Sequence, residues 1–197
     1  IHKAVERMGF AEMTEVQEKT IPVMLAGHDV IAKAPTGTGK TCAFGIPVAE
    51  HIDPEKKYPQ AVIMAPTREL AQQIAEELTE LTYFMPEVQV ACVYGGANME
   101  KQARRLAEGC QIVVATPGRL MDHYKHHSID LAHVTQVVLD EADEMLNMGF
   151  YRDVRHIIEL MKARKSLSMF SATISREVMD IGWLYQNNAE EITVQPR

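Results

Sequence analysis

Short apolar runs recur along the chain and constrain its fold more than any other feature. Several of them carry β-branched residues without polar alternation, and helix-length stretches lie between them. Strands of this kind are covered on both faces, as they are in parallel sheets flanked by helices. We therefore predict an α/β fold: an open, mostly parallel, doubly wound sheet with helices on both faces. The predicted strands cover residues 30–32, 61–65, 88–93, 112–115, 134–139, 167–170 and 192–194, and two of the predicted helices cover 68–81 and 177–185.

Length, charge and cysteine content narrow the class of protein. The 197 residues, 46% of them hydrophobic, suit one domain with a full apolar core. No run approaches the roughly 18 apolar residues of a membrane-spanning helix, and the chain opens without Met, which suggests a piece of a longer protein. The net charge of −7 means that nucleic acid would need a local basic patch, such as segment 101–125. Three widely spaced cysteines predict reduced thiols in a cytoplasmic protein.

A glycine-rich segment follows the first predicted strand. Its residues are Ala34, Pro35, Thr36, Gly37, Thr38, Gly39, Lys40 and Thr41. The backbone amides of such a loop, with the N-terminal end of the next helix, can hold an anionic phosphate. Lys40 would reach the β- and γ-phosphates of a nucleotide, and the Thr41 hydroxyl would ligate magnesium. The general pattern has glycine where Ala34 stands, so a plain strand-to-helix turn is the alternative. A dinucleotide motif is disfavoured, because Cys42 occupies its third glycine position.

Acidic residues follow the predicted strand 134–139. The carboxyl ends of parallel strands share one edge of the sheet, so Asp140 is expected beside the phosphate loop. We predict that Asp140 holds magnesium partly through water, and that Glu141 orients or deprotonates the attacking water. The alternative is that these acidic residues only favour the first turn of the next helix.

The sequence Asp140-Glu141-Ala142-Asp143 resembles the signature of the DEAD-box RNA helicases. The chain is similar to the first RecA-like domain of that family along nearly its whole length. Segment 34–41 fits motif I, in which alanine is the family's usual residue at position 34. The other similar segments, in the family's order, are the Q motif (Gly9, Phe10, Thr14, Gln17), motif Ia (Pro66, Thr67, Arg68, Glu69, Leu70), the GG motif (Gly95, Gly96), motif Ib (Thr116, Pro117, Gly118, Arg119) and motif III (Ser171, Ala172, Thr173).

The resemblance implies one RecA-like, ATP-binding domain over residues 1–197, with the second helicase domain absent from this chain. It implies ATP and Mg²⁺ as cofactors, with Phe10 and Gln17 at the adenine. It also implies contacts to the RNA backbone without sequence specificity, and no membrane. The implied RNA contacts are Pro66, Thr67, Arg68, Gly95, Gly96, Thr116, Pro117, Gly118 and Arg119, and the implied coupling residues are Asp143, Ser171 and Thr173.

Several of these residues also have a purely structural interpretation. Gln17 completes a capping box with Thr14, which would satisfy amides at a helix start. Arg68 and Arg119 could form ion pairs within the domain, and motif III could be an ordinary hydroxyl-rich turn. Met13 stands where the Q motif usually has proline, so adenine selectivity is expected to be weaker than phosphate binding.

The expected function is that of the nucleotide- and RNA-binding lobe of an ATP-dependent RNA helicase, which couples ATP hydrolysis to local duplex unwinding or RNP remodelling. In this family the second domain supplies an arginine finger, so the lobe alone is expected to unwind nothing. The alternative is a nucleotide-switched RNA clamp or scaffold module. His123 and His127 have the spacing of a metal pair without a third ligand nearby in sequence, and Trp183 is predicted to pack on the last helix.

Overall fold

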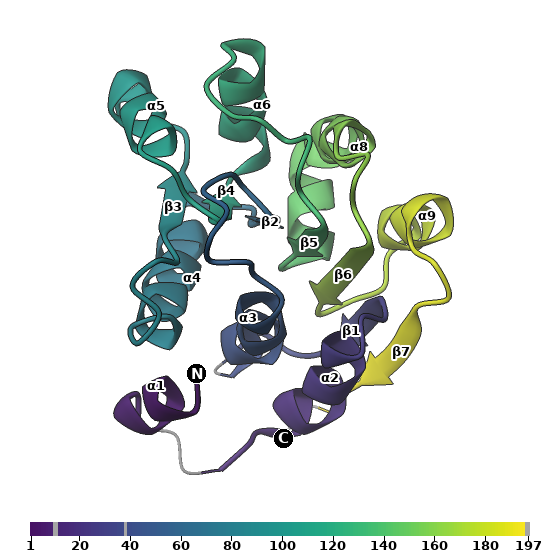
Figure 1. Ribbon diagram of the computed structural model, residues 1–197. Coiled ribbons are helices and arrows are strands. Elements are labelled where there is room, and N and C mark those ends of the chain that lie inside the picture. The colour runs from purple at the N-terminus through teal and green to yellow at the C-terminus, as the bar shows by residue number, and fades with distance from the viewer. Residues whose placement is uncertain (10–11, 38, 196–197) are drawn as a thin grey trace.

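The computed structural model describes residues 1–9, 12–37 and 39–195. Seven parallel strands form one sheet in the order β3-β4-β2-β5-β6-β1-β7 (Figure 1). The predicted open parallel sheet is therefore confirmed, and the strand ends differ from prediction by only a few residues. The strands are β1 (Val30–Lys33), β2 (Ala61–Met64), β3 (Val90–Val93), β4 (Ile112–Ala115), β5 (Gln136–Leu139), β6 (Ser166–Ser171) and β7 (Glu190–Thr193).

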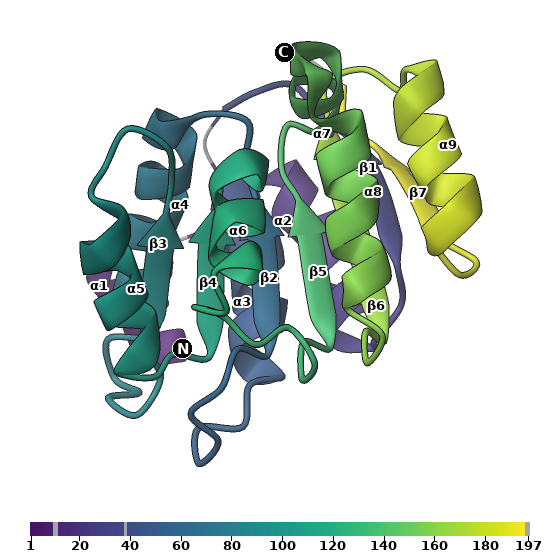
Figure 2. The same ribbon diagram turned by 90° about the horizontal axis from the view of Figure 1, so that it is seen from above.

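Helices cover the sheet on both sides (Figure 2). One face carries α1 (His2–Arg7), α2 (Glu15–Leu25), α3 (Lys40–Glu50) and α4 (Arg68–Leu81). The other face carries α5 (Met99–Ala107), α6 (Pro117–Lys125), α8 (Tyr151–Leu160) and α9 (Arg176–Tyr185). A short helix α7 (Ala142–Met145) and a π-helical turn η1 (Leu146–Phe150) connect β5 to α8.

The central strands are apolar on both faces because each face has its own core. In β2, Val62 and Met64 pack into the core beneath α6 and α8, whereas Ala61 and Ile63 pack into the core beneath α3 and α4. All four are fully buried. Successive side chains of a strand point to opposite faces, so a strand that lies between two helical layers needs no polar positions.

Helices α3 and α4 lie against each other through a glycine. An added Cβ at Gly45 would lie 2.8 Å from Leu81 Cδ1 and 3.0 Å from Leu78 Cδ2. The missing side chain therefore lets the two helices approach closely. Helix α4 begins at a conventional cap, where the Thr67 hydroxyl accepts a hydrogen bond from the Leu70 amide.

The strand order divides the carboxyl edge of the sheet into two neighbouring parts. The loops after β5, β6 and β1 carry the acidic segment 140–143, motif III and the glycine-rich segment. The loops after β3, β4 and β2 carry the GG motif, motif Ib and motif Ia. Adjacent strands bring each group of loops together.

One prediction about the last helix is wrong. Trp183 on α9 does not pack, because 84% of its surface is exposed. It lies with Met179 along a groove between α9 and β7. Among the described residues, no helix is both long and apolar enough to cross a membrane.

Candidate nucleotide site and nucleic-acid interface

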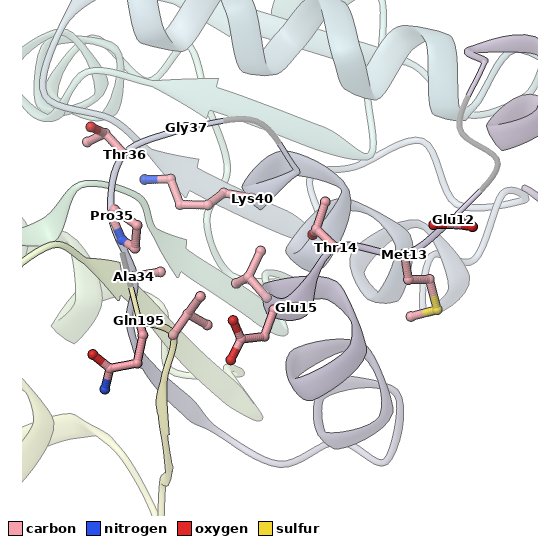
Figure 3. Close-up of a pocket in the computed structure, with 12 residues that line it drawn as sticks. Glu12, Met13, Thr14, Glu15, Ala34, Pro35, Thr36, Gly37, Lys40 and Gln195 are labelled. Atoms are coloured by element: carbon pink, nitrogen blue, oxygen red, sulfur yellow. The ribbon is translucent and has the colours of Figure 1, made fainter. Parts of the chain in front are cut away.

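An open cleft of about 590 Å³ lies over the glycine-rich segment (Figure 3). The loop after β1 forms one wall, with Ala34, Pro35, Thr36 and Gly37, and Lys40 reaches into it from the start of α3. Segment 12–16 and residues 194–195 form the other sides. Sequence reasoning assigned no role to residues 194–195, which come close only through the pairing of β1 with β7. Of the predicted site residues, Phe10 and Thr38 lie outside the described part of the chain.

Lys40 and Asp140 meet at the base of the cleft. Lys40 Nζ lies 3.2 Å from Asp140 Oδ1, and the two side chains are only 7% and 2% exposed. Lys40 Nζ is buried and makes no aligned hydrogen bond within residues 1–9, 12–37 and 39–195. Burial raises the pKa of Asp140, and the neighbouring ammonium group of Lys40 opposes that rise. A buried cation with unused donors is poised for an anionic ligand.

Gly39 and Gln17 join the glycine-rich loop to α2. Gly39 has φ +95°, and a Cβ there would lie 2.8 Å from Thr14 Oγ1. Gln17 Nε2 donates to the Gly39 carbonyl at 3.1 Å, while Gln17 Oε1 accepts from the Thr14 amide at 3.0 Å. Thr14 and Gln17 also form the capping box of α2. The amide of Gln17 is therefore engaged within the domain, as the structural interpretation had it, and it positions the phosphate loop.

Glu141 occupies a left-handed backbone conformation directly after Asp140. Its φ is 47° and its ψ is 52°, and its amide donates to Asp140 Oδ1 at 2.9 Å. Burial raises the pKa of the Glu141 carboxyl, and the positive charge of Lys40 opposes the shift. A non-glycine residue in this conformation is strained, and such strain collects at functional sites.

Asp143 connects α7 to motif III. Asp143 Oδ2 accepts from the Thr173 hydroxyl at 2.8 Å and from the Thr173 amide at 3.0 Å. The Asp143 amide donates to Ser171 Oγ at 3.1 Å, and that hydroxyl donates to the Thr173 carbonyl. The acidic segment and the end of β6 thus form one hydrogen-bonded unit, and the partner of motif III is Asp143 rather than Asp140.

Glu77 on α4 is a site residue that sequence reasoning missed. Burial raises the pKa of its carboxyl, while hydrogen bonds with Thr41 and Gln73 oppose the shift. The Asp140 charge also raises it, so Glu77 faces the same cluster of charges. Its place inside an amphipathic helix left no sequence signal that distinguished it from a solvent-facing glutamate.

The loops after β2, β3 and β4, here called the second group of loops, form a surface beside the cleft. Arg68 is exposed at the start of α4, and its guanidinium carbon lies 4.9 Å from the ring centre of Tyr94. A Cβ at Gly96 would lie 3.7 Å from Arg68 Nη1. Gly95 and Gly96 are both exposed, so the backbone there is accessible. The structure brings motif Ia and the GG motif together at this point.

Arg119 differs from Arg68 because its side chain, 14% exposed, is largely engaged within the domain. Arg119 Nη1 donates to the Ala97 carbonyl at 3.0 Å and to Gln102 Oε1 at 3.1 Å. Its Nε lies 3.7 Å from Asp122 Oδ2, which is the ion pair that the structural interpretation anticipated. The preceding residues Thr116, Pro117 and Gly118 form the start of α6, where Thr116 makes no side-chain cap. The first amides of α6 therefore lack that side-chain partner.

A family model and individual relatives both match this chain. The DEAD/DEAH box helicase model matches residues 14–181. An ATP-dependent RNA helicase CshA from Listeria monocytogenes is 48% identical over 197 residues, which are 100% of this chain and 38% of that protein. An ATP-dependent RNA helicase DeaD from Escherichia coli is 42% identical over 195 residues, which are 99% of this chain and 31% of that protein. The chain therefore spans less than half the length of these curated relatives.

A crystal structure of a hypothetical ATP-dependent RNA helicase from Sulfolobus tokodaii superposes with a TM-score of 0.90 at 40% identity, covering 98% of this chain and 56% of that one. A DEAD-box protein from Methanococcus jannaschii has the same TM-score at 37% identity, with 98% of this chain and 53% of that one covered. The fold is the RecA-like fold predicted from the sequence. The chain therefore belongs to the DEAD/DEAH box helicase family.

Proposed function

We propose that this chain is the nucleotide- and RNA-binding lobe of an ATP-dependent RNA helicase. The observation that carries the proposal is the buried Lys40 ammonium group, which lies beside Asp140 at the base of an open cleft and makes no aligned hydrogen bond within the described residues. An anionic phosphate at this place would supply the acceptors that Lys40 lacks.

The residues of the cleft fit ATP with Mg²⁺. The loop 34–39 and the start of α3 would surround the phosphates, and Thr41 with Asp140 would hold the metal, partly through water. Bound Mg²⁺ neutralises phosphate charge. Glu141 would orient or deprotonate the attacking water, and its raised pKa favours proton acceptance at neutral pH. Gln17 on α2 supports the loop through the Gly39 carbonyl, and we propose that Gln17 also contacts the adenine.

The loops after β2, β3 and β4 would hold RNA through its phosphates. The exposed Arg68, the accessible backbone at Gly95 and Gly96, and the first amides of α6 are groups that bind phosphate without reading bases. Asp143, Ser171 and Thr173 would couple the two halves of the edge, since they join the acidic segment to the end of β6.

A nucleotide titration tests the proposal. Lys40→Ala removes the phosphate-facing cation, so we expect affinity for Mg-ADP or Mg-ATP to fall at least about tenfold, measured by calorimetry. Lys56→Ala, an exposed lysine in the loop before β2, is the matched control and should bind as the original chain does. Unchanged affinity in Lys40→Ala would rule out the phosphate role of Lys40 and with it the proposed site.

We also infer a second RecA-like domain in the same polypeptide, because the helicase relatives are more than twice as long as this chain. That domain would complete the ATPase site, and this lobe alone would not unwind RNA. The unpaired cysteines Cys42, Cys92 and Cys110, in which burial raises the thiol pKa to about 11, suit a reducing compartment such as the cytoplasm. The alternative of a nucleotide-switched RNA clamp or scaffold module stays a prediction.

A further inference from the structure

A buried glutamine lies at the centre of the second group of loops. Gln102 on α5 is 8% exposed, and all of its polar atoms are used. Its Nε2 donates to the Tyr94 carbonyl at 3.0 Å. Its Oε1 lies 3.1 Å from Arg119 Nη1 and 3.0 Å from His123 Nε2. Nothing in the sequence distinguished Gln102 from other polar residues of this helix.

The three contacts fix the orientation of the Gln102 amide. The Gln102 carbonyl accepts from Arg119, while its amide nitrogen faces the Tyr94 carbonyl, so a flipped amide would lose both of these hydrogen bonds. Because Oε1 is an acceptor, His123 Nε2 carries a proton and donates it to Gln102. Burial and the nearby charge of Arg119 lower the pKa of His123. The buried ring of His123 on α6 therefore holds the Gln102 side chain through a hydrogen bond to Oε1.

The same hydrogen bonds hold both ends of residues 94–97, here called the GG loop. Tyr94 at one end is bound by Gln102, and Ala97 at the other is bound by Arg119. The loop between them carries Gly96, which has φ +86° and lies next to Arg68. Helices α5 and α6 are neighbours on one face of the sheet (Figure 2), and the loop is contacted by Gln102 of α5 and Arg119 of α6. A free loop containing two glycines would otherwise sample many conformations.

We propose that Gln102 is a positioning residue for RNA binding: it holds the Arg119 guanidinium and the GG loop in one arrangement before RNA arrives. The inference rests on the proposed function, because the loops that it orders are those assigned to RNA phosphates. Ordering this surface on folding lowers the conformational entropy lost when RNA binds. Gln102 itself does not touch the ligand.

The test is RNA affinity of the chain for a fluorescent single-stranded homopolymer, measured by anisotropy at low salt. We expect Gln102→Met to weaken binding about fivefold, since the charge-assisted hydrogen bond with Arg119 and the hydrogen bonds with Tyr94 and His123 are lost. Gln111→Met is the matched control. Gln111 is also a fully buried amide with three hydrogen bonds, but it precedes β4 at the opposite edge of the sheet. The Gln111→Met variant should lose about as much folding stability as Gln102→Met does, and it should keep its affinity for RNA.

A double-mutant cycle separates positioning from general damage. In an Arg119→Ala background, Gln102→Met should weaken binding by clearly less than the roughly fivefold expected alone, because the part of its effect that acts through Arg119 is already lost. Arg119→Lys keeps the charge but cannot make both bonds, so it should bind nearly as weakly as Arg119→Ala. That variant tests the idea even if Gln102→Met does not fold.

The outcomes distinguish the positioning role of Gln102 from the proposed RNA surface on which that role depends. If Arg119→Ala weakens binding but Gln102→Met or Arg119→Lys does not, the positioning role is wrong and the RNA surface stands. Additive losses in the cycle would also overturn the positioning role. If Arg119→Ala and Arg68→Ala both bind RNA normally, the proposed RNA surface fails and the positioning role fails with it.

Discussion

At the residue scale, two backbone conformations at the nucleotide site are unfavourable for ordinary side chains. Gly39 has φ +95° and lies against Thr14, whereas Glu141 has φ 47° and carries a side chain nonetheless. Glycine relieves the strain at the first position, where only support of the loop is needed. A carboxylate stands at the second position in spite of the strain, which fits the role proposed for Glu141.

Gly39→Ala should lower the free energy of unfolding by about 2 kcal/mol, because the new Cβ meets the Thr14 side chain in a strained backbone. Gly37→Ala is the control in the same loop. Its Cβ would meet nothing within 4 Å, so its effect on stability should stay within about 0.5 kcal/mol. Chemical denaturation of the three proteins measures both values, and equal losses at the two positions would contradict the expectation.

Glu141→Gly should raise the free energy of unfolding by about 0.5–1 kcal/mol, since glycine adopts the left-handed conformation without strain. Glu141→Gln keeps a side chain in that conformation and should leave most of the strain in place. Comparison of the two midpoints in urea isolates the backbone contribution. A destabilised Glu141→Gly variant would show that the strain is absent.

At the element scale, short connections decide how the strand ends act together. Helix α7 is one turn long, and the hydrogen bonds of Asp143 tie it to the end of β6. Burial would raise the pKa of Asp143, but hydrogen bonds from Thr173, Glu144 and Ser171 outweigh it and lower the pKa below the ordinary value of 3.8. The ionised carboxylate therefore stabilises the folded chain.

The sign of that pH dependence follows from linkage. A lowered carboxyl pKa contributes stability above pH 3.8, and this contribution is lost as pH falls through the lowered value. Asp143→Asn should thus reduce the free energy of unfolding by about 1 kcal/mol near neutral pH, discounted for partial exposure, and by less below pH 3.8. Urea denaturation across this range gives the difference. Asp180→Asn, which loses no hydrogen bond or ion pair found in the described residues, should show no such trend.

At the scale of the whole molecule, the sheet places two candidate sites on one edge. Strands β5, β6 and β1 carry the loops assigned to the nucleotide, and β3, β4 and β2 carry the loops assigned to RNA. Neighbouring β2 and β5 are the boundary, where the Asp140 amide donates to the Met64 carbonyl at 3.0 Å. The acidic segment after β5 and motif Ia after β2 therefore lie at the ends of directly neighbouring strands.

The chain alone should hydrolyse ATP very slowly, because an arginine finger from a second domain is worth on the order of 10³–10⁵ in rate in related phosphoryl transfer. Phosphate release with saturating RNA, compared between this chain and a longer polypeptide containing the second domain, measures the difference. Glu141→Gln in the longer protein checks that the activity belongs to this site. Equal rates with and without the second domain would show that the lobe is complete by itself.

The fold and much of the candidate site follow from local patterns in the chain. Buried runs without alternation predicted the parallel sheet, and the position of Asp140 after such a run predicted its approach to Lys40. The prediction for Trp183 failed, since an aromatic residue in a helix is usually packed, and only the arrangement of α9 and β7 leaves it exposed. The RNA role of Arg119 stays a prediction; its hydrogen bonds to Ala97 and Gln102 are contacts whose partners the sequence did not specify.

By itself, the sequence determined which segments are strands and helices, which loops are candidates for binding phosphate and that parallel strands would align those loops at one edge. Local periodicity and motif spacing are properties of neighbouring residues, so no coordinates are required to recognise them. Only the tertiary structure decided which side chains share a hydrogen bond: Gln17 with the phosphate loop, Asp143 with Thr173, and Gln102 with Arg119. These pairs join elements distant in the chain, and their geometry depends on strand order and helix packing, which no local pattern specifies.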